Sequence, residues 1–255
     1  MRTLDESEFL IEAMSPDALP IEEIKAVLRK NTFACIRGII SPQEIYQALK
    51  KIEITLDPSK DQKPLNLAPD VVRRNFQKLT VGGESRLSKY DDAKLFRAVY
   101  NPIWEDDIYG MRLAFTKLAM VRNVIAGMQV DFATDKIESN GLWTAARFHQ
   151  YPAGGGFFRR HLDFVAEDIS KKNEVDFYQL VLTMSKKGEH YHVGGAFVDI
   201  NDERVCIDDY AEPGDIIIYD GRTMHGVEDI DPGEILDLQS LNGRLAGFAT
   251  LYKKL

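Results

Sequence analysis

The stretch PGDIIIYDGRTMHGV, residues 213–227, decides the fold class. Pro213-Gly214 and Asp220-Gly221 are turn pairs, and the branched and aromatic run Asp215–Tyr219 between them is typical of a short strand. Met224–Val227 predicts a further strand directly after the second turn. Short strands joined by glycine turns, with no helix between them, favour an antiparallel sandwich or jelly roll over a parallel α/β sheet.

The same pattern extends on both sides of this stretch, through the part of the chain that follows residue 140. Short apolar or β-rich runs alternate there with glycine turns, and Pro152–Gly156 breaks the first of them. The expected strands are Leu142–Tyr151, Phe177–Met184, Gly194–Ile200, Arg204–Ile207 and Leu245–Tyr252.

Helical patterns dominate before residue 135. Apolar spacing predicts helices over 20–30 and 105–130, and Ser41 with Glu44 predicts a capping box on a helix that runs from Pro42 to about residue 56. A strand is expected over 32–38, and 57–92 is expected to be loop with a strand near 78–81. We therefore expect a mainly β fold with α: one catalytic domain over 1–255, with a mostly helical support over 1–135 and a β core over 136–255.

Composition and charge exclude several classes of protein. The chain has 255 residues, 44% of them hydrophobic and 28% charged, which is ordinary for a globular protein. Its formal net charge of −8 is unfavourable for general binding to nucleic acid or anionic membranes. Two distant cysteines make no disulfide framework, and no apolar run predicts a signal peptide or a membrane span. The expected location is the cytoplasm.

Three side chains combine into a candidate metal site. His161-Leu162-Asp163 places an imidazole and a carboxylate on one face of an extended segment, and His225 follows the strand and turn described above. Two imidazoles and one carboxylate are the facial triad of non-heme Fe(II) oxygenases. That triad leaves positions open for a chelating 2-oxo acid and for dioxygen. A lone H-x-D arises easily by chance, so the surrounding sequence has to support it.

The surrounding sequence resembles a known family. Tyr151–Gly155, Gly194–Phe197, the stretch 213–227 and Arg244 follow one another as in the 2-oxoglutarate- and Fe(II)-dependent oxygenases, in their phytanoyl-CoA-dioxygenase-like and prolyl-hydroxylase-like part. The resemblance covers about residues 143–252, and the segment 33–41 resembles the usual entry to that family. It implies a double-stranded β-helix whose iron ligands are His161, Asp163 and His225. It also implies that Arg244 pairs with the distal carboxylate of 2-oxoglutarate.

Two departures from the family pattern leave alternatives for the cosubstrate. Arg244 lies 19 residues after His225, farther than in many members, so Arg147 and Arg222 are further candidates for the same carboxylate. Val227 stands where some relatives carry a hydroxyl group, and that contact is expected instead from Thr183 or Tyr178.

His149, Trp143 and Phe158 are the candidates for the substrate pocket. Each also has a plain structural interpretation, as a hydrogen-bonded barrel histidine or as a packing aromatic.

His190-Tyr191-His192 supports a rival interpretation. Cupins share this barrel and use an H-x-H pair followed by a glutamate, but Val193–Phe197 contains none. A cupin-like metal-binding barrel that does not use 2-oxoglutarate therefore remains the alternative. A non-catalytic binding barrel and an oxygenase that acts on a macromolecule are the other two.

The resemblance implies oxidation, most simply hydroxylation, of a small metabolite or free amino acid, with 2-oxoglutarate converted to succinate and CO2. Related halogenases have glycine or alanine where this chain has Asp163, so we expect no halogenation. The expected partner is a small-molecule substrate, with no nucleic acid and no membrane, and two copies of the chain could pair as a homodimer.

Overall fold

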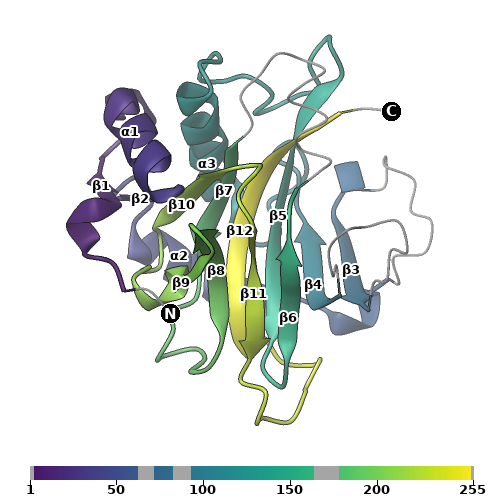
Figure 1. Ribbon diagram of the computed structural model, residues 1–255. Helices are drawn as coiled ribbons and strands as arrows, with labels where there is room; N and C mark the ends of the chain where they lie inside the picture. Colours follow the sequence, from purple (N-terminus) through teal and green to yellow (C-terminus); the bar gives the residue numbers. More distant parts are fainter. Residues whose placement is uncertain (1–2, 63–71, 83–92, 164–177, 254–255) are drawn as a thin grey trace.

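Two layers of antiparallel strands face each other and form the centre of the molecule (Figure 1). The computed structural model describes residues 3–62, 72–82, 93–163 and 178–253. The strands of the first sheet are, in spatial order, β1 (Leu10–Glu12), β2 (Phe33–Arg37), β10 (Ile216–Asp220), β7 (Tyr178–Thr183), β12 (Gly243–Lys253), β5 (Leu142–Pro152), β4 (Lys94–Tyr100) and β3 (Phe76–Val81). Those of the second are β6 (Gly156–His161), β11 (His225–Ile230), β8 (Gly195–Ile200) and β9 (Glu203–Cys206).

The chain alternates between the two sheets. It passes from β5 to β6, from β7 to β8 and from β11 to β12, and β4 pairs with both β5 and β6 so that the sheets join at one edge. This alternation is the winding of a double-stranded β-helix, so the jelly-roll expectation is confirmed. Only β1 and β2 pair in parallel among the described strands.

Three helices, α1 (Ile21–Asn31), α2 (Pro42–Thr55) and α3 (Arg112–Ile125), gather on one side of the strands (Figure 1). They pack on the outer face of the first sheet, because alternate strand residues such as Ile36 and Leu182 share one hydrophobic core with helix residues such as Ile45 and Phe115. The other set of alternate residues points between the two sheets, where Val181 and Phe248 pack against Val198 of β8.

The capping box expected before α2 is present. The Ser41 hydroxyl accepts a hydrogen bond from Glu44 N, and the Glu44 carboxylate accepts one from Ser41 N. Helix α3 is shorter than the expected 105–130. Asp107 accepts hydrogen bonds from the amides of Met111 and Arg112 and so fixes the start of the helix at Arg112.

Three strands, β1, β4 and β6, were not expected from the sequence, and β4 and β6 pair with each other. With β1, β2 and β3, strand β4 brings sheet residues into the half of the chain where helices were expected to dominate. The start of the expected strand at Phe177, and residues 63–71 and 83–92 of the expected loop, lie outside the described residues. No helix among the described ones is long and apolar enough to cross a membrane.

Candidate metal centre and its cavity

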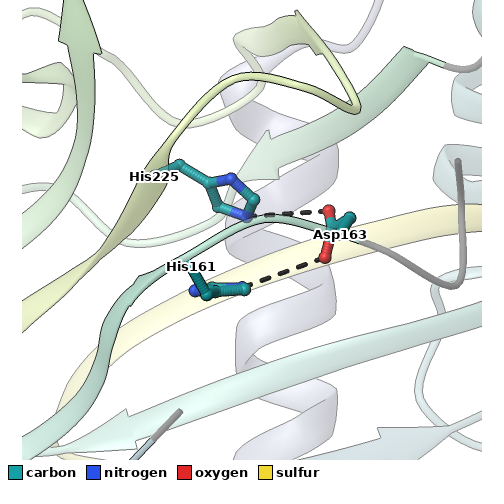
Figure 2. A group of neighbouring side chains, drawn as sticks. All are labelled: His161, Asp163 and His225. Atoms are coloured by element: carbon teal, nitrogen blue, oxygen red, sulfur yellow. Dashed lines mark ion pairs between the residues drawn. The ribbon is translucent and has the colours of Figure 1, made fainter. Parts of the chain in front are cut away.

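His161, Asp163 and His225 converge at one point between the sheets (Figure 2). Their nearest ligand atoms all lie within 4.8 Å of one another. Nε2 of His161 is 3.8 Å from Asp163 Oδ1, and Nε2 of His225 is 3.6 Å from Asp163 Oδ2. Among the described residues no other group of three or more His, Cys, Asp or Glu side chains converges in this way.

Strand pairing brings the two histidines together. His161 ends β6, His225 begins β11, and the two residues are direct cross-strand partners. A Cβ at Gly226 would lie 2.7 Å from the Phe158 carbonyl oxygen, so glycine at this position lets the two backbones approach beside the site. Asp163 follows two residues after His161 and lies on the same side, as the H-x-D spacing predicts.

Both imidazoles hold the tautomer that suits a metal ligand. Nδ1 of His161 donates to the Arg159 carbonyl at 2.8 Å, and Nδ1 of His225 donates to the Thr223 carbonyl at 2.9 Å. The neutral form of each ring therefore carries its proton on Nδ1, and the Nε2 atoms that face the carboxylate are the ones available to a metal. Burial, together with the neighbouring His225, lowers the pKa of His161 to about 4, so its imidazole is neutral at pH 7.

Two arginines line the cavity that contains the three side chains, and both come from the first sheet. Arg244 on β12 lies opposite Tyr151 of β5, and Arg147 lies four residues before Tyr151 on the same strand. At about 3.3 Å per residue, the two positions are about 13 Å apart along the sheet.

Arg244 already has a carboxylate partner. Its Nε donates to Asp208 Oδ2 at 2.6 Å and its Nη2 to Oδ1 at 3.1 Å, with both side chains 4% exposed. Burial alone would lower the pKa of Arg244, but Asp208 outweighs it and the net direction is upward. Asp208 also accepts hydrogen bonds from Tyr191 Oη and Ala196 N, and Nη1 of Arg244 has no hydrogen-bond partner among the described residues.

Arg147 is buried without an acidic partner within ion-pair distance among the described residues. Its Nε donates to His149 Nε2 at 3.1 Å, and its Nη1 donates to the Ala145 carbonyl and to Thr250 Oγ1. Three aromatic rings surround the guanidinium, whose central carbon lies 5.0 to 5.8 Å from the ring centroids of Phe248, Tyr252 and Tyr100.

His149 is in the cavity wall as a neutral imidazole. Its Nε2 accepts from Arg147, which places the proton on Nδ1, 3.4 Å from the Tyr151 hydroxyl. Burial, and then the charge of Arg147, hold the pKa of His149 well below its usual value. Phe96 and Phe248 contact its ring at centroid distances of 4.6 and 4.4 Å.

The other expected site residues fall in different places. Phe158 lines the cavity and stacks on His161, with ring centroids 3.7 Å apart. Thr183 is not among the cavity-lining residues, although it is buried beside Ala246 and its hydroxyl has no hydrogen-bond partner in the described part of the chain. Trp143 packs against Tyr252 and the other aromatics of a separate hydrophobic cluster, outside the cavity lining.

Arg222 and Tyr178 lie away from the metal centre. The side chain of Arg222 is 78% exposed and pairs with Asp220. Both residues line a separate surface pocket between α1 and the tips of the second sheet. This placement removes Arg222 from the arginines that could reach a cosubstrate held at the triad.

The H-x-H pair does not join the triad. His190 Nδ1 accepts from Lys186 N, and His192 is exposed, with its backbone amide bonded to Asp231. Tyr191 between them is buried and donates to Asp208. Without a convergent carboxylate, the pair lacks the arrangement that the cupin alternative requires.

Sequence reasoning missed Asp208 and Tyr219. Asp208 follows the strand of a hairpin in a short acidic run, Asp208-Asp209, whose pattern is that of a solvated turn. Tyr219 lines the cavity with its ring 4.7 Å from that of His225, and the inward-facing positions of its predicted strand were a usable signal for it.

No protein-family model and no curated protein matches the sequence. Solved structures do match the fold. A prolyl-4-hydroxylase from Pseudomonas putida aligns with a TM-score of 0.53 at 12% identity, over 90% of this chain and 98% of that one. A prolyl hydroxylase from Trichoplax adhaerens, in complex with a hypoxia-inducible-factor peptide, aligns with a TM-score of 0.55 at 13% identity, over 91% of this chain and 89% of that one. EctD from S. alaskensis, with 2-oxoglutarate and 5-hydroxyectoine, aligns with a TM-score of 0.51 at 14% identity, over 94% of this chain and 77% of that one.

A further match has a different activity. The α-ketoglutarate-dependent epimerase SnoN from nogalamycin biosynthesis aligns with a TM-score of 0.54 at 13% identity, over 91% of this chain and 82% of that one. At such identities the likeness concerns the fold, and it extends over most of both chains. The protein therefore has the double-stranded β-helix fold of the 2-oxoglutarate- and Fe(II)-dependent oxygenases.

Proposed function

We propose that this protein is an Fe(II)- and 2-oxoglutarate-dependent oxygenase that hydroxylates a small organic molecule. The observation that carries the proposal is the convergence of His161, Asp163 and His225, with both Nδ1 atoms bonded to backbone carbonyls and both Nε2 atoms facing the carboxylate. The fold supports it, because the solved structures that share this fold include hydroxylases and an α-ketoglutarate-dependent epimerase.

The three side chains fit a divalent iron ion. Two neutral imidazoles and one carboxylate supply the nitrogen and oxygen donors of the facial triad. The Arg159 and Thr223 carbonyls hold the rings in position, which is the usual second layer around a metal-binding histidine. When bound, iron with 2-oxoglutarate and dioxygen supplies the oxidising power, and the cosubstrate ends as succinate and CO2.

We assign the distal carboxylate of 2-oxoglutarate to Arg244. Two of its guanidinium nitrogens are fixed by Asp208, which leaves the Nη1 edge to donate into the cavity. Burial raises the pKa of Tyr151 to about 12, so its hydroxyl stays protonated beside Arg244. The partnerless hydroxyl of Thr183 lies one row farther along the sheet, where a carboxylate oxygen would satisfy it.

The chain's own residues determine what is oxidised. Phe158, Phe197 and Phe248 line the cavity and exclude water from it, while the cavity positions the substrate's C–H bond beside the triad. Asp163 supplies a negative ligand where a halide would otherwise have to bind, which supports oxygen transfer rather than halogenation. His149 and Phe158 remain our substrate-facing residues.

The test is metal binding by calorimetry with Mn(II), a redox-stable substitute for Fe(II). Wild-type protein should bind one Mn(II) per chain, and His225→Ala should abolish that binding. His192→Ala is the matched control, because His192 is exposed and lies outside the triad. Equal Mn(II) affinity in wild type and His225→Ala would refute the metal centre.

Succinate release with Fe(II), 2-oxoglutarate and a metabolite panel then tests the activity. Metabolites that raise succinate release are to be checked for a product that is heavier by one oxygen atom. Products that lack the added oxygen would keep the metal centre and refute hydroxylation.

A further inference from the structure

Two cations lie near one tyrosine ring on the inner face of the first sheet. The central guanidinium carbon of Arg147 lies 5.8 Å from the ring centroid of Tyr100, and Lys78 Nζ lies 5.6 Å from the same centroid. The register places them on one face, because Tyr100 is the cross-strand partner of Arg147 while Lys78 pairs with Ala98, which pairs with His149.

Neither cation is neutralised by the described part of the chain. Lys78 and Arg147 have no carboxylate within ion-pair distance there, whereas Arg244, which lines the cavity with Arg147, forms an ion pair with Asp208. Burial, and also the charge of Arg147, lower the pKa of Lys78. Two like charges held together in a half-buried wall form an arrangement that an anion would stabilise.

The cosubstrate cannot use both arginines. 2-Oxoglutarate has two carboxylates, and one of them is spent on chelation beside the 2-oxo group. The single distal carboxylate reaches one arginine, and the positions of Arg147 and Arg244 are about 13 Å apart along the sheet. One buried arginine of the cavity therefore remains for another anion.

Arg147 is the arginine that faces the reacting end of the cavity. The ring of Tyr219 lies 4.7 Å from that of His225, and Tyr219 is the cross-strand partner of Gln179. Thr250 Oγ1 donates to Gln179 and accepts from Arg147 Nη1, so Arg147 lies at the end of the sheet nearest the triad. An anion bound at Arg147 would thus hold a molecule next to the metal ligands, and the ring of Phe248, which lines the cavity, would contact its carbon skeleton.

We propose that Arg147, assisted by Lys78, binds a carboxylate of the organic substrate, so that the oxidised molecule is a carboxylic acid. This inference rests on the proposed function and adds to it the chemical class of the substrate. Nη2 of Arg147, which has no hydrogen-bond partner among the described residues, is the donor, and His149 keeps the guanidinium oriented through Nε. Lys78 adds a positive charge beside the same tyrosine ring.

The experiment measures acid and amide probes on protein saturated with Mn(II) and 2-oxoglutarate. The probe pairs are acetate with acetamide, benzoate with benzamide, and 3-phenylpropionate with its amide, titrated by calorimetry up to about 10 mM, where binding remains measurable. We expect at least one acid to bind about tenfold more tightly than its amide, because only the acid carries the charge.

Three variants test whether the preference for acids depends on Arg147 and Lys78. Arg147→Gln should remove the preference for acid over amide, and Lys78→Gln should reduce it several-fold. Lys78 is only partly buried, so Lys78→Gln still tests the proposal if Arg147→Gln does not fold. Arg222→Gln is the control: it removes the same charge at an exposed position away from the cavity. In all three variants the affinity for 2-oxoglutarate should stay within about twofold of wild type.

Three results would overturn the proposal. One is that no acid binds, or that every acid binds no better than its amide. Another is a preference that survives in both Arg147→Gln and Lys78→Gln. The third is a loss of 2-oxoglutarate affinity in Arg147→Gln, which would make Arg147 the cosubstrate's arginine. Failure of Mn(II) and 2-oxoglutarate to bind the wild type is a separate outcome, because it would refute the proposed function itself.

Discussion

Replacing Asp208 with asparagine tests two roles of its buried ion pair with Arg244: its contribution to stability and its effect on 2-oxoglutarate binding. The change keeps the size of the side chain but removes the charge that neutralises Arg244. Both side chains are 4% exposed, so the values measured for surface ion pairs do not apply. Removing one partner of a buried pair costs about 3–5 kcal/mol, because the remaining charge is left uncompensated.

The same variant should bind 2-oxoglutarate more tightly. If the cosubstrate's distal carboxylate pairs with Arg244, it competes electrostatically with Asp208 in the wild type and replaces it in Asp208→Asn. We expect an affinity gain of about tenfold, corresponding to about 1.4 kcal/mol. A binding gain of this size would also restore part of the lost stability when the ligand is in excess.

Urea unfolding, with and without 2-oxoglutarate, measures both effects. Lys117→Gln is the matched control, because it breaks a pair with Glu44 whose side chains are both 27% exposed, and it should cost no more than about 1 kcal/mol. A loss below 1 kcal/mol in Asp208→Asn would contradict the burial argument. Unchanged or weaker 2-oxoglutarate binding would show that Arg244 does not hold the distal carboxylate.

Three further predictions concern stability and pH. Gly243→Ala should destabilise the fold by about 2–4 kcal/mol in urea unfolding, because its φ is +118° and the added Cβ would lie 2.2 Å from the Tyr151 carbonyl oxygen. Trp143→Ala should cost about 3–5 kcal/mol by the same assay and leave Mn(II) and 2-oxoglutarate affinities unchanged, since Trp143 is 1% exposed and packs outside the cavity; a selective loss of ligand binding would contradict this. Burial alone would raise the pKa of Asp208, but Arg244 lowers it below the ordinary 3.8. The stability difference between wild type and Asp208→Asn should therefore stay constant above about pH 5 and shrink only as the pH falls below 4; a difference lost near pH 6 would contradict the assignment.

The β core was readable from the sequence because its signals are local. Short branched runs between glycine turns gave seven of the strands within a few residues, and the Ser41 and Glu44 capping box gave the start of α2. Strand β4 was missed because its buried arginine, Arg97, looks polar, and the carboxylate that pairs with it among the described residues is Asp61, 36 residues away. Strand β6 was missed because Arg159 and Arg160 resemble a solvated edge.

The site could be predicted only in part, because only some of its residues are brought together by local sequence signals. The spacing His161-x-Asp163 determines a shared face, and the later His225 needed only the jelly-roll winding to reach it. The partner of Arg244 is Asp208, which follows the hairpin of β8 and β9 in the opposite sheet, so no spacing in the sequence predicts the pair. Tertiary contacts likewise determine that Arg244 has a carboxylate partner, whereas Arg147 has none among the described residues.

A crystal grown with Mn(II) and 2-oxoglutarate tests the central claim most directly, through the anomalous difference map. We predict one metal peak within coordination distance of Nε2 of His161, Nε2 of His225 and the Asp163 carboxylate, with 2-oxoglutarate extending from it to Arg244. The absence of a peak at these three side chains, or a peak at His190 or His192 instead, would contradict the metal centre and the function built on it.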